Sequence, residues 1–253
     1  MQKLLVFTLF VFMVQAVAFS QEMMVQGKHI LIYTKTGEGY VHANIAASVK
    51  AIQEICDKEQ ILYDVSDNPE IMTKENLGKY DALFFANASN KVFETQKQRD
   101  AFQAFCRSGK GFGGIHAANT AERDWPWFVQ LIGGKFVRHP KFQSFDVLVV
   151  DPEHPSTKPL PKRWTVEDEC YLSDQLNPDI HILMVADLNT LEDDKLSEYP
   201  GNTFYQSFPL VWCHRFEGGR QWFSALGHAP EFYSDPTFRA HIRGGILWLL
   251  GEE

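Results

Sequence analysis

Residues 109–119, Gly-Lys-Gly-Phe-Gly-Gly-Ile-His-Ala-Ala-Asn, decide the fold that we predict for this chain. They predict a glycine-rich buried strand that ends at His116. Residues 95–108 have the spacing of an amphipathic helix, for which Gly109 is the expected C-terminal stop. Residues 124–126, Asp-Trp-Pro, are typical of an N-cap followed by proline in the first helical turn. His116 is therefore expected where a strand gives way to a loop, and open α/β sheets bind ligands there.

The chain on both sides of this stretch alternates between predicted strands and helices. Near-continuous apolar runs at 28–34 and 81–86 are typical of parallel strands covered on both faces. The other expected elements are a helix at 45–56, a strand at 61–65, a helical turn at 73–79, strands at 142–150, 180–186, 209–216 and 221–226, an acidic surface segment at 188–202, and a helix at 237–250. This alternation implies a parallel sheet with right-handed crossovers.

The first twenty residues have the features of a secretory signal peptide. Lys3 supplies a weak positive charge, residues 4–14 are apolar apart from one threonine, and residues 16–18, Ala-Val-Ala, offer a cleavage site. The apolar run is short for a membrane span, although an uncleaved anchor is the alternative. We therefore expect a signal peptide at 1–20, a single domain at 21–253 without a membrane span, and export to the periplasm or out of the cell.

Charge and cysteine content limit the partners and the covalent links of the chain. The formal net charge is −8 and there is no basic run, which argues against nucleic acid and anionic membranes as partners. The cysteines are widely spaced and no pair has the spacing of a zinc site. We expect buried free thiols rather than disulfides at all four cysteines, which are Cys56, Cys106, Cys170 and Cys213.

Three histidines each follow a predicted strand. His42 follows the first strand, His116 the fourth, and His228 the strand that ends at residue 226. In a doubly wound sheet the first and fourth strands are normally neighbours, so we expect the three rings within about 10 Å of one another in one crevice. Each histidine alone is more simply explained as a hydrogen-bonded structural residue, but the set favours a site. The three can be general acids and bases or the ligands of a divalent metal.

A second polar group, Asp168-Glu169-Cys170-Tyr171, pairs two acidic residues with a phenol and follows the aromatic Trp164. Adjacent residues of a strand point to opposite faces, so only one of Asp168 and Glu169 is expected to face the site. We choose Glu169, for which an exposed loop position is the alternative, and add the phenol of Tyr171. His139 lies in a His-Pro turn, which either presents its imidazole rigidly or only tightens the backbone.

Several enzyme classes lack their motif in this chain. There is no Gly-x-Ser-x-Gly elbow of a serine hydrolase. There is no phosphate-binding Gly-x-x-x-x-Gly-Lys-Ser/Thr loop, and no dinucleotide fingerprint follows the first strand.

Residues 28–251 resemble the ThuA-like (trehalose utilisation) family. The matching motifs, after the first strand with His42, are Gly111 to His116 with Ala117, Gly134-x-Phe136-x-x-His139-Pro140, Glu153-His154-Pro155 with Leu160-Pro161, Asp168-Glu169-x-Tyr171, Pro209-x-x-Trp212, Gly218-Gly219-Arg220, Leu226-Gly227-His228, and Gly245 with Trp248. The resemblance implies a flavodoxin-like three-layer α/β sandwich with a mostly parallel sheet, of the class I glutamine amidotransferase type. Amidotransferases of this type have a catalytic cysteine where this chain has His116. Cysteine-dependent glutamine hydrolysis is therefore excluded.

The resemblance also implies a role with trehalose-like disaccharides, or with their 3-keto derivatives, in which the keto group acidifies the neighbouring C–H bond. One hypothesis is an enzyme in which His116 and Glu169 are the acid/base pair for isomerisation, elimination or hydrolysis. His42, His139 and His228 would then orient the sugar, and Tyr171 or Trp212 would stack on it; His42, His116 and His228 are also the candidate metal ligands. The other hypothesis is a non-catalytic carbohydrate-binding protein on the same fold.

Overall fold

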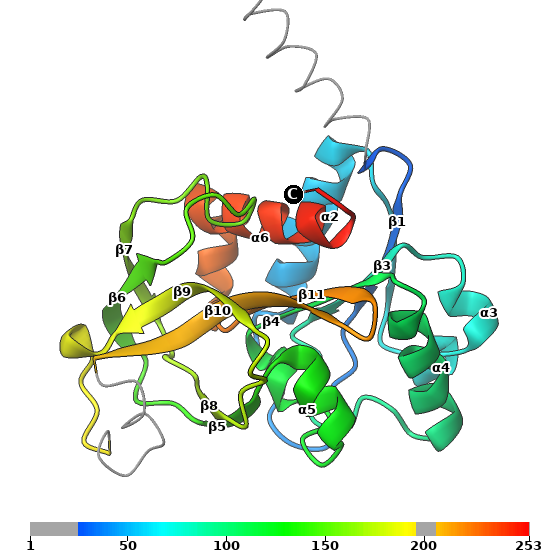
Figure 1. Cartoon of the computed structure of the whole chain (residues 1–253), viewed down its shortest axis with the longest axis horizontal. Coiled ribbons are helices and arrows are strands. Elements are labelled where there is room, and N and C mark those ends of the chain that lie inside the picture. The colour runs from blue at the N-terminus through cyan, green and yellow to red at the C-terminus, as the bar shows by residue number, and fades with distance from the viewer. Residues whose placement is uncertain (1–24, 196–205, 253) are drawn as a thin grey trace, which may run out of the picture.

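A nine-stranded sheet runs through the middle of the protein in the computed structural model, which describes residues 25–195 and 206–252 (Figure 1). The strand order is β2-β1-β3-β4-β11-β10-β9-β6-β7. The predicted signal peptide, and the end of the predicted acidic segment at 188–202, lie outside the described residues.

The sheet is parallel in the part that carries the strand-end histidines. In sheet order its parallel strands are β2 (Leu62–Ser66), β1 (His29–Tyr33), β3 (Ala82–Ala86), β4 (Gly111–Ile115) and β11 (Gly219–Ser224). The strands beyond them pair antiparallel and are β10 (Ser207–Phe216), β9 (His181–Asp187), β6 (Gln143–Val149) and β7 (Arg163–Asp168). A separate two-stranded sheet contains β5 (Lys135–Arg138) and β8 (Leu172–Asp174). The predicted flavodoxin-like α/β class is confirmed.

The first and fourth strands are not neighbours, which corrects one expectation. β3 lies between β1 and β4 because the chain adds β2 on one side of β1 and then crosses to add β3 on the other. This reversal at β1 and β3 is the topological switch point, at which loops of neighbouring strands diverge and leave a crevice. His42, after β1, and His116, after β4, still lie at one crevice, because the loop after β1 extends for several residues before the next helix begins.

Helices cover both faces of the sheet. α2 (Ile45–Glu59) and α6 (Pro236–Leu249) pack together on one face (Figure 1). α4 (Gln96–Arg107) and α5 (Pro126–Ile132) cover the other, where Phe102 of α4 and Phe128 of α5 pack on Phe112 of β4. The short α3 (Lys74–Leu77) packs on α4. These layers form the expected three-layer sandwich.

The glycines of β4 allow α6 to pack directly on the sheet. A Cβ atom on Gly113 would lie 2.5 Å from Cδ1 of Leu249, and one on Gly111 would lie 2.6 Å from the Leu249 carbonyl oxygen. Real atoms do not approach so closely, so a larger residue at either position would push the C-terminal helix away from the strand. The glycine-rich run thus brings helix and strand into contact just before the turn at His116.

Side chains cap α4 and α6, whereas α2 and α5 begin without a side-chain cap. Thr95 and Gln98 form a capping box at the start of α4, and the Asp235 side chain caps α6. Proline lies in the first turn of α5, as predicted, but the helix begins at Pro126, its N-cap is Trp125 rather than the predicted Asp124, and no side chain caps it. Proline in the first turn does not itself prevent a cap, because α6 also begins with proline and is capped by Asp235.

All four cysteines are buried and free, as predicted. Within residues 25–195 and 206–252, no helix has the length and apolar character needed to cross a membrane.

Three histidines away from the strand-end group are buried inside the fold. His154, His214 and His241 are at most 7% exposed. Burial disfavours the charged ring and lowers the pKa of each from 6.5 to about 4. His241 makes contacts of 2.8 Å with the Ser156 carbonyl oxygen and 3.1 Å with the Ser224 hydroxyl, so its neutral ring links α6 to the sheet.

We predict that the free energy of unfolding falls as the pH is lowered from about 7 to 4. In that range the unfolded chain protonates these histidines while the folded protein does not, and each contributes up to about 3 kcal/mol. Urea unfolding at several pH values measures this, and His241→Gln should show a shallower dependence than the wild type. Equal slopes for the two proteins would contradict it.

Candidate active site

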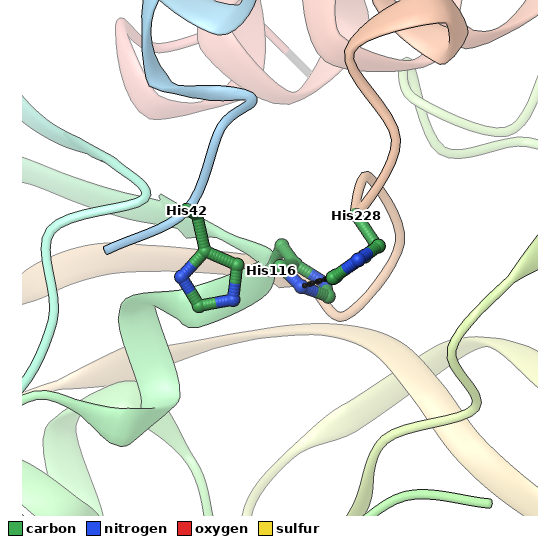
Figure 2. A group of neighbouring side chains, drawn as sticks. All are labelled: His42, His116 and His228. Atoms are coloured by element: carbon green, nitrogen blue, oxygen red, sulfur yellow. Dashed lines mark hydrogen bonds between the residues drawn. The ribbon is translucent and has the colours of Figure 1, made fainter. Parts of the chain in front are cut away.

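Three imidazole rings meet at the carboxyl edge of the parallel strands (Figure 2). The ring centroids of His42 and His116 are 5.0 Å apart, those of His116 and His228 are 5.2 Å apart, and those of His42 and His228 are 5.8 Å apart. One ring nitrogen from each histidine lies within 4.8 Å of the other two. The predicted convergence of the three rings is thus confirmed.

The backbone turn at His116 places its ring in this group. β4 ends at Ile115, and His116 has a φ of +48°, in the left-handed region that residues other than glycine rarely adopt. A short 3-10 helix, His116–Thr120, follows directly. The chain therefore turns sharply at the end of the strand, and the side chain of the turning residue lies against the rings of His42 and His228.

The hydrogen bonds of His116 fix its tautomer. Its Nδ1 lies 3.0 Å from the carbonyl oxygen of Ala225, which can only accept, so Nδ1 donates and Nε2 keeps the lone pair. Nε2 lies 3.3 Å from Nδ1 of His228. The ring is 0% exposed, and burial lowers its pKa well below 6.5. His116 is therefore a neutral ring that directs a lone pair toward His228.

Glu169 lies beside the same rings. Its Oε2 is 3.0 Å from Nδ1 of His228 and 3.8 Å from Nε2 of His116, and its Oε1 is 3.5 Å from Nδ1 of His139. The hydrogen bond to Glu169 raises the pKa of His228. The expectation that Glu169, rather than its neighbour Asp168, faces the histidines holds.

Asp168 instead fixes the backbone that carries His228. Its carboxylate accepts hydrogen bonds from the N–H groups of Gly227 (2.6 Å), Glu169 (2.8 Å) and His228 (3.0 Å). It is fully buried, and burial raises its pKa to about 6 although the three N–H groups favour the charged form. Asp168 is thus a positioning residue that the sequence did not reveal.

A second hydrogen-bond network fixes the carbonyl oxygen of Gly227, next to His228. The Asn44 side-chain amide donates to the Gly227 carbonyl oxygen at 2.6 Å and to the Asn87 side chain at 3.1 Å. The Tyr233 hydroxyl donates to the same Gly227 oxygen at 2.9 Å. The N–H group and the carbonyl oxygen of Gly227 are therefore both hydrogen-bonded, which restricts movement of His228.

His42 is the least constrained of the three histidines. Its Nε2 lies 3.3 Å from the Tyr171 hydroxyl, and its Nδ1 has no hydrogen-bond partner in the described part of the chain. The side chain is buried, and this burial, with the nearby His228, lowers its pKa to about 4. His42 is thus neutral and has a ring nitrogen available.

His42 and His228 line a cavity of about 590 Å³, a volume typical of small-molecule sites. His116 lies beneath the cavity wall rather than in it. The lining residues are Glu38, Gly39, Tyr40, His42, Ser89, Asn90, Thr120, Arg123, Phe136, His139, Glu169, Tyr171 and His228.

Tyr171 and Trp212 were the residues predicted to stack on a sugar, and only Tyr171 lines the cavity. Tyr171 lines the cavity, but it is only 3% exposed and its ring packs on His116 at a centroid distance of 4.2 Å. Trp212 is not in the site, and the prediction that it stacks on a sugar is wrong. It is 1% exposed in β10, where its Nε1 donates to the Ile132 carbonyl oxygen at 2.8 Å and its ring packs on Phe223.

The sequence reasoning missed an exposed aromatic residue at the cavity. Tyr40 is 66% exposed and its ring is 4.8 Å from that of His42. It also missed Asn90 after β3 and Arg123 after the turn at His116. All three lie in loops that leave the carboxyl ends of β1, β3 and β4, so strand-end position was the signal that could have found them.

The fold and the site together define a class I glutamine amidotransferase-like protein in which histidine occupies the nucleophile turn. The chain belongs to the ThuA (trehalose utilisation) family, whose model matches residues 29–249. This membership points to a role in sugar metabolism. No match was found among curated proteins.

Solved structures agree with this fold. A ThuA-like protein from Bacteroides uniformis is 22% identical, with a TM-score of 0.71, over 89% of this chain and 92% of that one. A ThuA-like protein from Parabacteroides merdae is 19% identical, with a TM-score of 0.66, over 89% and 91%. A glutamine amidotransferase from Thermotoga maritima is 8% identical, with a TM-score of 0.51, over 90% and 100%.

We predict that Asp168→Ala lowers the free energy of unfolding by at least about 2 kcal/mol, because it leaves three buried N–H groups without their acceptor. Urea unfolding at pH 7 measures the change. Glu167→Gln, at an exposed position on the same strand, is the matched control and should stay within about 0.5 kcal/mol of the wild type. Equal stability of the two variants would contradict the anchoring role of Asp168.

Proposed function

We propose that this protein is an enzyme that transfers a proton on a keto derivative of a trehalose-like disaccharide. The observation that carries the proposal is the carboxylate of Glu169, which lines the cavity and lies between His228 and His139. A titratable group grouped with several others in a cleft is typical of an active site. Family membership supports a sugar as the substrate.

Glu169 is the proposed base. A ketone acidifies the C–H bond next to it, and the carboxylate takes that proton while the electron pair of the bond moves to the ketone oxygen. Return of the proton to the opposite face of the same carbon epimerises the sugar. If the proton of the neighbouring hydroxyl instead moves to the enolate oxygen and the former ketone carbon is protonated, the sugar is isomerised. Alternatively, the enolate re-forms the ketone while the deprotonated carbon forms a C=C bond with the carbon that bears the glycosidic oxygen. That oxygen leaves and takes up a proton, which releases the second sugar.

His116 is proposed to position His228 and not to contact the substrate. Because its ring is fully buried, the proposed reaction has Glu169 exchange the proton and His116 hold His228 through the Nε2 contact at 3.3 Å. Histidines on the cavity side then face the developing negative charge on the sugar oxygen. His42, His139 and His228 are the proposed substrate-binding histidines.

Aromatic rings at the cavity suit a sugar ligand. Tyr40 takes the role that was expected of Trp212, because it lines the cavity and most of its ring is exposed. Phe142 is not among the lining residues of the cavity, but it is 40% exposed and its ring is 5.7 Å from that of His228, which does line it. The same two rings would serve a non-catalytic carbohydrate-binding protein, which would bind the sugar and leave it unchanged.

Export is a further part of the proposal. It rests on the apolar run and the small residues at positions 1–20. Mass spectrometry of the native protein should show a chain that starts near residue 19 or 21, in the periplasm or outside the cell. A native chain that retains Met1 would contradict export with cleavage.

We predict that Glu169→Gln lowers turnover of 3-keto disaccharides by about 10²- to 10⁴-fold, because glutamine cannot accept the proton. Product formation and exchange of the acidified C–H for deuterium both measure the step, and a binding titration checks that the sugar still binds. Glu167→Gln is the control. Normal turnover by Glu169→Gln would refute the assignment, whereas binding without turnover by the wild type across a panel of glycosides and 3-keto glycosides would favour the binding protein.

A further inference from the structure

The geometry points to a divalent transition-metal site at His42, His116 and His228. We propose that these three imidazoles bind one ion of the zinc type, with Glu169 beside its open side. The proposal rests on the proposed function for the purpose of the ion, whereas binding of the ion can be tested without any sugar.

The spacing of the three rings fits a metal ion. Zinc–nitrogen bonds of 2.0–2.1 Å at tetrahedral angles place two ligand nitrogens about 3.3 Å apart. Nε2 of His116 and Nδ1 of His228 are already 3.3 Å apart. Since the three ligand atoms all lie within 4.8 Å of one another, His42 needs to move by at most about 1.5 Å to complete the site.

The surroundings of His116 and His228 are those of metal ligands. A ligating histidine usually donates its other ring N–H to a carbonyl or a carboxylate, which fixes the lone pair on the metal side. His116 does this through its Nδ1 contact with the Ala225 carbonyl oxygen. The backbone of His228 is fixed by Asp168, so two of the three ligands are rigid before any ion arrives.

His42 supplies the third ligand and the means of closing the site. Among the described residues, its Nδ1 has no hydrogen-bond partner and its Nε2 has a 3.3 Å contact with the Tyr171 hydroxyl. An unpaired polar atom in a buried side chain costs free energy, and a metal–nitrogen bond would remove that cost. His42 also lies on a loop, next to the exposed Tyr40, where a small rotation is easier than in a strand.

The donor set selects the kind of ion. Three imidazoles suit zinc, iron, nickel or copper, whereas calcium and magnesium prefer oxygen donors. Three protein nitrogens leave a tetrahedral ion one position for substrate. An ion there would bind the ketone oxygen and stabilise the enolate that Glu169 generates.

Metal content is the first test. Protein purified without chelators should contain about one transition-metal ion per chain. After removal of metal with a chelator, the protein should bind Zn²⁺ or Co²⁺ at one equivalent, and Co²⁺ should give the visible absorption of a site with nitrogen ligands. A stripped protein that binds neither ion at one equivalent would overturn the proposal.

Variants locate the ion. His228→Ala, at a partly exposed side chain, should weaken binding of Co²⁺ by at least about 10²-fold, and His116→Ala should do the same if circular dichroism shows that it is folded. His181→Gln is the control, because His181 is an exposed histidine paired with Asp151 outside the site. Retention of wild-type Co²⁺ affinity by His228→Ala would place any bound ion elsewhere and overturn the assignment.

The failure of the metal site and the failure of the proposed reaction give different results. One Co²⁺ per chain without turnover of any glycoside or 3-keto glycoside would support the metal site and refute the enzyme. Turnover of a 3-keto glycoside by a protein that binds no Co²⁺ at one equivalent would refute the metal site and support the enzyme. Glu169→Gln should retain Co²⁺ within about 10-fold, because only the three histidines are proposed as ligands.

Discussion

The sharp turn at the end of β4 is the constraint on which the rest of the site depends. Gly111 and Gly113 let α6 lie against the strand, and His116 then turns the chain with a φ of +48°. A left-handed residue at this position holds its side chain in one direction, provided that the surroundings fix the turn. They do so here, because the ring is fully buried and bonded to the Ala225 carbonyl oxygen on the neighbouring strand end. The site formed by His42 and His228 therefore depends on the fixed position of the His116 ring.

Asp168 connects the two halves of the sheet at this point. It is the last residue of β7, the edge strand, which lies four positions from β11 in the sheet order. It nevertheless accepts hydrogen bonds from Gly227 and His228, which follow β11. The antiparallel strands must therefore curve back over the carboxyl edge of the parallel strands, as twisted sheets do. This curvature brings Glu169 to the histidines, so the antiparallel half of the sheet supplies the carboxylate and the parallel half supplies the imidazoles.

The sequence predicted those parts of the fold that follow from local pattern. The apolar runs of β1 and β3 are nearly continuous, and the convergence of strand-end histidines follows from the direction of parallel strands. The strands β5, β7 and β8 were not predicted because they are short or half-exposed, so no strong apolar run marks them. Trp212 was misplaced because an aromatic residue in a motif looks the same whether it packs in the core or faces a ligand. The bonds of Asp168 join residues about 60 positions apart, and no local pattern reveals such a contact.

Histidine at the nucleophile turn changes the chemistry that this fold can support. The resemblance to amidotransferases places a cysteine there, whose thiolate must reach the substrate to form a covalent bond. The ring of His116 cannot reach the substrate in this way, because it lies beneath the cavity wall and one nitrogen is bonded to Ala225. What the turn retains is a single lone pair held in a fixed direction, toward the rings that leave β1 and β11. The Nε2 lone pair of His116 can therefore accept a proton or bind a metal ion beside it, but it cannot attack a substrate in the cavity. The site is therefore built by several neighbouring strand ends together, where an amidotransferase depends on one nucleophile.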